Sequence, residues 1–250
     1  MNLIKKAAED ILKAKMGIAL TGAGISTESG IPDFRSKDGL WSRYDINEYG
    51  HIDSFKKNPA KVWTMLREMI SLMNAEPNPA HYALAELEKM GYINAVITQN
   101  VDNLHQEAGS KNVIEFHGNF KRVVCTRCGK KKGVDKIDME NLPPMCECGG
   151  ILKPDGIFFG EAIPRNAYLK SVALATKCDL MLVIGTSASV YPASQLPYLA
   201  KGSLTKPKGI VIEINKETTD ITGIVSDYII EGKAGEILPK IVEEIKSITS

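Results

Sequence analysis

Six short apolar runs punctuate the chain, and each ends in glycine or in a polar residue. They span residues 17–22, 93–100, 113–117, 180–187, 209–215 and 227–232. Runs of this length without polar alternation are typical of strands that are buried on both faces, as in a parallel sheet.

Amphipathic helical patterns precede and separate several of these runs. Residues 3–15 carry apolar side chains at helical spacing, which predicts a first helix. A second helix is expected to begin after Asn78 as its N-cap and to end at Gly91. A last helix carries apolar residues over 237–245, with Pro239 tolerated in its first turn. Strands that alternate with helices predict an α/β fold built on a doubly wound parallel sheet.

Two regions do not follow this alternation, and we interpret both as insertions that form a smaller second lobe. The first spans residues 33 to about 78 and joins a loop-like stretch, 41–50, to a helical stretch, 59–73. The second spans residues 119–154 and contains four of the five cysteines.

The composition excludes several classes of protein. With 44% hydrophobic and 24% charged residues, the 250-residue chain is not disordered, collagen-like or a coiled coil. The 31 Lys and Arg against 30 Asp and Glu leave a net charge of +1, so no direct nucleic-acid binding is expected. The apolar runs are too short to span a membrane and the N-terminus has no signal-peptide core, so we expect a cytoplasmic protein with no membrane partner.

Four cysteines form the pattern C-x₂-C-x₁₇-C-x-C at Cys125, Cys128, Cys146 and Cys148. Four thiolates at such spacing can hold one tetrahedral Zn²⁺ with no open coordination position, which predicts a structural rather than a catalytic zinc. The alternative is a loop with four unpaired thiols. The second pair is one residue shorter than the usual spacing, so Cys148 is the least secure ligand. The fifth, Cys178, is expected to be a small buried hydrophobe.

Short glycine-rich or polar segments stand at the ends of five of the six runs. They comprise Gly22, Ala23, Gly24, Gln99, Asn100, His117, Gly185, Thr186, Ser187 and Asn215. The carboxyl ends of parallel strands meet at one edge of a sheet, so these segments predict a cofactor crevice there.

The turn at residues 22–30 is rich in glycine and follows a predicted strand, as phosphate-binding turns do. Glycine also serves tight turns for steric reasons alone. Thr27 stands where the dehydrogenase fingerprint has its third glycine. A hydride-transferring dehydrogenase is therefore disfavoured, whereas nucleotide binding is not.

The four histidines differ in their expected roles. His117 ends the run 113–117 on the presumed ligand edge, where an imidazole is suited to act as a general base; the alternative is a packed strand-end residue. His81 and His105 lie within helical segments and are interpreted as structural. His51, in a polar loop, carries no signal.

Seven blocks of the sequence occur in an order that carries a family resemblance. They are 22–36 (GAGISTESGIPDFRS), 98–109 (TQNVDNLHQEAG), 115–119 (EFHGN), the paired cysteines, 157–161 (IFFGE), 185–193 (GTSASVYPA) and Asn215. From about Ile18 to Glu236 they resemble the sirtuins, the silent-information-regulator family of NAD-dependent protein deacylases.

The resemblance implies a Rossmann-like NAD-binding domain and a smaller lobe with a helical module and a zinc ribbon. Residues 1–32, 79–118 and 155–250 would form the Rossmann-like domain. Residues 33–78 would form the cofactor-binding loop and helical module, and residues 119–154 the zinc-binding module.

The resemblance also implies roles for individual residues. The catalytic set would be His117, Asn100 and Asp102. NAD would contact Gly22, Ala23, Gly24, Thr27, Asp33, Phe34, Arg35, Gln99, Asn100, Val101, Asp102, Gly185, Thr186, Ser187, Asn215 and Ala234. The peptide would pair as an added strand near Ile157, Phe159, Gly160 and Val190.

The implied activity is NAD-dependent protein lysine deacetylation, with acetyl-lysine and NAD converted to lysine, nicotinamide and O-acetyl-ADP-ribose. His117 would take a proton from a ribose hydroxyl, and Phe34 would shield the reacting ribose carbon from water. Two alternatives remain open: a sirtuin-like mono-ADP-ribosyltransferase that uses the same cleft, and a non-enzymatic zinc-ribbon binding module.

The resemblance bears on the acyl group as well. Family members that prefer acidic acyl groups carry a Tyr-x-x-Arg pair on the helix matching residues 61–69. Leu66 and Met69 stand at those positions here, and Arg67 is out of phase. Acetyl or a longer apolar acyl group is therefore expected in preference to succinyl.

Overall fold

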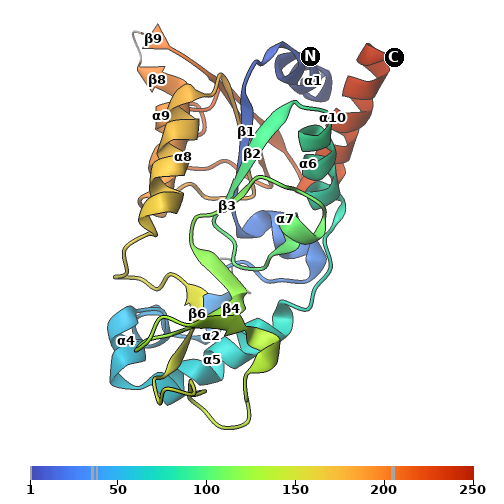
Figure 1. The fold of residues 1–250 in the computed structure, drawn as a ribbon. Helices are drawn as coiled ribbons and strands as arrows, with labels where there is room; N and C mark the ends of the chain where they lie inside the picture. Colours follow the sequence, from blue (N-terminus) through green and yellow to red (C-terminus); the bar gives the residue numbers. More distant parts are fainter. Residues whose placement is uncertain (1, 35–36, 38, 204–205) are drawn as a thin grey trace.

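The computed structural model describes residues 2–34, 37, 39–203 and 206–250 (Figure 1). Its largest element is a six-stranded sheet in the order β11-β10-β7-β1-β2-β3, in which every neighbouring pair is parallel. The strands are β1 (Gly17–Thr21), β2 (Ile93–Thr98), β3 (Val113–Glu115), β7 (Leu180–Ile184), β10 (Ile210–Asn215) and β11 (Tyr228–Glu231). Each of the six predicted runs supplies one strand, so the predicted parallel sheet is confirmed.

Helices cover both faces of this sheet. They are α1 (Leu3–Lys13), α6 (Pro79–Lys89), α8 (Arg165–Lys177), α9 (Leu196–Lys201) and α10 (Ala234–Thr249). Figure 1 shows α1, α6 and α10 on one side and α8 and α9 on the other. Successive side chains of a strand point to opposite faces, so Ala19 joins the apolar core beneath α1, α6 and α10. Ile18 and Leu20 join the core beneath α8 and α9.

The predicted helix ends are close to the observed ones. Asn78 caps α6: its side chain accepts from the N–H of Ala80 at 2.9 Å, and its own N–H donates to His81 Nδ1 at 3.2 Å. Gly91 follows the helix in a left-handed conformation, with φ of 85°. Pro239 was expected in the first turn of the last helix, but α10 begins at Ala234 and Pro239 lies inside it.

A smaller lobe lies beyond one end of the large sheet (Figure 1). It contains α2 (Leu40–Arg43), α3 (Ile46–Tyr49), α4 (Ile52–Lys57), α5 (Pro59–Leu72) and an antiparallel sheet of β4 (Gly118–Cys125), β5 (Lys131–Gly133) and β6 (Leu152–Gly156). The helical stretch 59–73 was predicted, whereas residues 41–50, expected as a loop, contain α3 and most of α2. Asp45 stabilises α3 because its carboxylate accepts from the first free N–H groups of that helix.

The lobe has a core of its own, in which Trp63 is fully buried. The indole Nε1–H of Trp63 donates to the carbonyl oxygen of Leu152 at 2.9 Å and so joins α5 to β6. The remaining elements are short: α7 (Leu104–Glu107), the 3₁₀ helices η1 (Ala23–Ser29), η2 (Val134–Lys136) and η3 (Ala193–Gln195), and the pair β8 (Gly202–Ser203) and β9 (Lys206–Pro207). Among the described residues, no helix has the length and apolar character required to cross a bilayer.

Candidate functional site

A cleft of about 960 Å³ lies where the carboxyl ends of the parallel strands face the smaller lobe. This volume is at the upper end for small-molecule sites and can hold a dinucleotide. The predicted site residues that line it are Gly22, Ala23, Gly24, Thr27, Asp33, Phe34, Gln99, Asn100, Val101, His117, Ile157, Phe159, Gly160, Gly185, Thr186, Ser187, Val190, Asn215 and Ala234. Arg35 lies outside the described residues.

Two glycine turns meet at the floor of this cleft, one after β1 and one after β7. The N–H of Gly24 donates to the carbonyl oxygen of Gly185 at 2.8 Å. A Cβ on Gly185 would lie 2.4 Å from the backbone nitrogen of Ile25, and its φ of 58° disfavours other residues. Side chains are therefore excluded where the turns cross. This bare backbone cradle fits the pyrophosphate of a dinucleotide.

Thr186 joins three strand ends across the cleft. Its hydroxyl accepts from Gln99 Nε2 at 2.9 Å, and its carbonyl oxygen accepts from Asn215 Nδ2 at 3.1 Å. The side chains that follow β2 and β10 are thus fixed against the turn that follows β7. These strand ends therefore converge in the structure, as predicted.

Asn100 is held by two bonds that use its amide nitrogen. Nδ2 donates to the carbonyl oxygen of Gly22 and to Ser26 Oγ, both at 3.1 Å. Within the described part of the chain, no hydrogen bond uses its carbonyl oxygen, and the residue lines the cleft. Asn100 can therefore accept a hydrogen bond from a ligand while its orientation stays fixed.

His117 lies in the short link between β3 and β4, directly after the predicted strand. Its Nδ1 is 3.1 Å from the carbonyl oxygen of Gln99, which can only accept, so Nδ1 carries the proton and Nε2 is left as an acceptor. Burial lowers the pKa of His117, and the bond to Gln99 opposes this effect. The imidazole is therefore neutral near pH 7, as a general base must be.

Asp102 lies beneath the main cleft, where it lines an adjoining cavity of about 30 Å³. Its side chain accepts from the hydroxyl of Ser26 at 2.7 Å and from the N–H of Leu104 at 3.0 Å. Burial raises the pKa of this carboxyl. Ser26 thus connects Asp102 to Asn100, and no feature of the sequence indicated this role.

His81 and His105 lie behind Ser26 and are both buried. Their rings meet edge to face with centroids 4.9 Å apart, and His105 Nε2 is 2.9 Å from Thr21 Oγ1. Burial lowers the pKa of His81 to about 4 and that of His105 well below its ordinary value. Both rings are neutral and packed, in agreement with their interpretation as structural residues.

The His81 ring makes protein stability depend on pH. Its pKa is about 4 in the fold against 6.5 for an exposed imidazole, so below pH 6.5 the unfolded chain binds a proton that the folded chain does not. Each pH unit from there toward 4 is expected to lower the free energy of unfolding by about 1.4 kcal/mol through this ring. His81→Gln keeps the capping acceptor and removes the titration. Urea unfolding at a series of pH values should therefore show that the free energy of unfolding falls less steeply with decreasing pH in the variant than in the wild type. Equal dependence on pH would show that His81 does not carry the lowered pKa.

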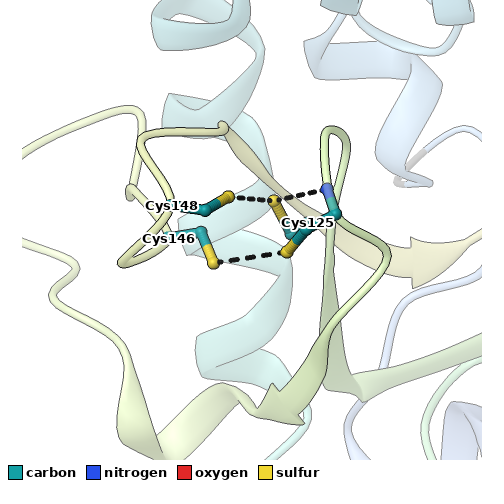
Figure 2. A group of neighbouring side chains, drawn as sticks. Cys125, Cys146 and Cys148 are labelled. Carbon is teal, nitrogen blue, oxygen red and sulfur yellow. Dashed lines mark hydrogen bonds between the residues drawn. The ribbon is translucent and has the colours of Figure 1, made fainter.

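The four clustered cysteines come together at the far end of β4 (Figure 2). Their sulfur atoms all lie within 4.8 Å of one another, with Cys125 3.5 Å from Cys148 and Cys128 3.9 Å from Cys146. Tetrahedral zinc with Zn–S bonds of about 2.3 Å needs sulfur atoms about 3.8 Å apart. The donor set fits zinc, and Cys148 belongs to it despite the short C-x-C spacing.

The backbone around this cluster favours the binding of a cation. The N–H groups of Cys128 and Arg127 donate to the Cys125 sulfur at 3.5 and 3.4 Å, and they lower the pKa of that thiol. A Cβ on Gly150 would lie only 2.6 Å from the same sulfur, so the second turn approaches as closely as glycine allows. Cys178 is buried away from the cluster, as predicted.

Some residues that line the cleft had no clear signal in the sequence. The smaller lobe contributes Trp41, Tyr49 and Met65, and the segment after β10 contributes Lys216, Glu217, Thr218, Thr219 and Asp220. The first group resembles ordinary apolar core positions. The second directly follows a predicted strand end, which could have marked it.

Comparisons with known proteins agree with this geometry. A family model described as the Sir2 family matches residues 22–192. An NAD-dependent protein deacylase of Pyrococcus furiosus is 50% identical, with 99% of this chain and 100% of that protein covered. A Sir2 homologue solved with NAD has a TM-score of 0.89 at 41% identity, with 98% of this chain and 95% of that chain covered.

A second solved structure contains a peptide and an acetylated ADP-ribose. A Sir2 protein in complex with a deacetylated p53 peptide and 3′-O-acetyl-ADP-ribose has a TM-score of 0.90 at 36% identity, with 96% of this chain and 98% of that chain covered. The matched region spans the glycine cradle, His117 and the cysteine cluster. This chain belongs to the Sir2 family.

Proposed function

We propose that this protein is an NAD-dependent protein lysine deacetylase, which converts acetyl-lysine and NAD to lysine, nicotinamide and O-acetyl-ADP-ribose. The observation that carries the proposal is the neutral His117, with Nε2 available as an acceptor, in a cleft that also contains the bare backbone cradle. The names of the relatives, deacylase and deacetylase, support it. Four of the five cysteines would hold one structural zinc per chain, and cysteines used for a metal site rather than for disulfides support a cytoplasmic location.

The proposed roles follow from position. Gly22 to Gly24 accommodate the phosphates, and Asn215 and Ala234 lie at the adenosine end. When bound, NAD supplies a ribose carbon that becomes electrophilic as nicotinamide leaves. Phe34 excludes water at that point, and Asn100, with Asp102 behind it, orients the ribose.

The segment Ile157–Gly160 is the proposed edge for the peptide. The N–H of Ile157 donates to the carbonyl oxygen of His117 at 3.0 Å, and the N–H of Phe159 donates to that of Gly50 at 2.9 Å. The segment is therefore fixed next to the general base by the large domain and by the smaller lobe together. An added peptide strand between it and Val190 would carry acetyl-lysine into the cleft.

The test is mass spectrometry of the products after incubation with an acetylated peptide, with and without NAD. We expect deacetylated peptide, nicotinamide and O-acetyl-ADP-ribose only when NAD is present. Deacetylation at the same rate without NAD would reject the proposal. A peptide that gains ADP-ribose and keeps its acetyl group would identify the transferase alternative instead.

The acyl group should be apolar, because Leu66 and Met69 both line the cleft. A succinyl carboxylate placed against these two apolar side chains would lose its hydration, and neither side chain offers a cation to pair with it. We expect kcat/KM for acetyl-lysine to exceed that for succinyl-lysine by about 10²-fold or more, since an unpaired buried charge costs about 3 kcal/mol or more. Leu66→Tyr combined with Met69→Arg should shift this ratio toward succinyl.

Arg67→Ala provides the matched control for this selectivity. The Arg67 guanidinium donates to the carbonyl oxygen of Met139 at 3.4 Å and does not line the cleft. Its loss is expected to leave the ratio of acetyl to succinyl turnover unchanged. A ratio that follows Arg67 instead of the Leu66 and Met69 pair would overturn the assignment.

A further inference from the structure

Glu213 is a carboxylate in the interior of β10, with only 1% of its surface exposed. Three hydroxyl groups donate to it: those of Thr219, Thr222 at 2.7 Å and Ser226 at 2.5 Å. No Lys or Arg pairs with it among the residues that the structure describes. A carboxylate buried in a strand is costly unless its oxygen atoms are bonded, so this arrangement requires all three hydroxyls to stay in place.

All three hydroxyls belong to the segment that follows β10, residues 216–226. This segment forms one wall of the cleft, through Lys216, Glu217, Thr218, Thr219 and Asp220. It directly follows Asn215, whose side chain is bonded to the turn after β7. Glu213 therefore lies in the core, directly behind a wall of the proposed adenosine site.

The bonds within the segment form two turns that overlap at Ile221 and Thr222. In the first, the N–H of Thr222 donates to the carbonyl oxygen of Thr219 at 3.1 Å; in the second, the N–H of Ser226 donates to that of Ile221 at 3.1 Å. Glu213 accepts from residues of both turns. Its carboxylate thus anchors both the cleft-lining turn and the turn that follows it to β10.

We propose that Glu213 is a positioning residue for the adenosine half of NAD, acting through these hydroxyls on the 216–226 wall. The inference rests on the proposed function, since it concerns the same cleft. Glu213 itself does not line the cleft, so it affects NAD only through the segment that it holds. If the 216–226 segment is ordered in only a fraction of the molecules, the apparent affinity for the ligand is reduced to that fraction of its full value.

The experiment compares Glu213→Gln, Thr222→Val and the double variant with the wild type. The readouts are the dissociation constant of ADP-ribose by calorimetry, the KM for NAD, the KM for acetylated peptide and the melting temperature. Glu213→Gln should raise the first two by about fivefold or more, as for a wall ordered in one molecule in five, and leave the peptide KM unchanged. Thr222, which does not line the cleft, should act in the same direction. The double variant should be little worse than the stronger single variant, because both remove one network.

Ser171→Ala serves as the control, because Ser171 is fully buried on α8 and its hydroxyl has no partner within the described chain. It should leave ADP-ribose binding unchanged. A lower melting temperature for Glu213→Gln with unchanged ADP-ribose binding would overturn the inference and leave the proposed function intact. An equal rise in the KM for NAD and for peptide would also overturn it. Failure of the wild type to bind ADP-ribose would overturn both.

Discussion

His117→Ala is expected to lower the rate of NAD-dependent deacetylation by about 10²–10⁴-fold, the range for a positioned general base. The variant should still bind NAD and acetylated peptide. The bond from Nδ1 to Gln99 sets the tautomer and aims Nε2 as the acceptor, and alanine removes both. Initial rate, NAD affinity and melting temperature should be measured on one preparation.

Nicotinamide exchange sharpens this test. In the proposed reaction the proton transfer by His117 follows the departure of nicotinamide, so labelled nicotinamide should still exchange into NAD in His117→Ala. Asn100→Ala, in contrast, should impair both exchange and deacetylation. The Asn100 amide, held by its bonds to Gly22 and Ser26, orients the ribose before nicotinamide leaves. A near wild-type deacetylation rate with a lowered melting temperature would show that His117 is a packed residue and not the base.

The large sheet could be predicted from the sequence because burial on both faces removes the polar alternation of its strands. In the run 180–184, for example, all five residues are apolar and all five are buried. The short helices α2 and α3 could not be predicted, because four residues are too few for a periodic pattern. Their stability depends on packing against the core of the smaller lobe, with Leu40 buried in it.

Only some residues of the candidate site could be predicted from the sequence. His117, Asn100 and the glycine turns could be located because parallel strands bring their carboxyl ends to one edge. Ser26 and Glu213 could not, because their importance depends on which buried groups they meet. The alternation within β10 places Glu213 toward the core beneath α8 and α9, yet only the folded 216–226 segment supplies the hydroxyls that it needs.

Loss of one cysteine from the cluster is the second change with a large expected effect. Structural zinc contributes about 10–16 kcal/mol of binding free energy that appears as folding free energy. Cys125→Ala and Cys148→Ala should therefore lose most of the bound zinc and unfold the smaller lobe at a lower temperature than the large domain. Zinc content by mass spectrometry and melting by calorimetry are the measurements. Cys178→Ala is the matched control, because this buried thiol lies outside the cluster and should leave zinc content unchanged.

The effect on catalysis should be indirect. β4 begins at Gly118, next to His117, and ends at Cys125, so the zinc site is roughly 20 Å of extended strand away from the base. Loss of zinc can affect catalysis through β6, because β6 pairs with β4 and is followed by the Ile157–Gly160 segment. At temperatures where the variants keep a folded lobe, the peptide KM should rise before NAD binding weakens. If Cys148→Ala keeps full zinc and an unchanged melting temperature, Cys148 is not a ligand, and three thiolates hold the ion with some other group.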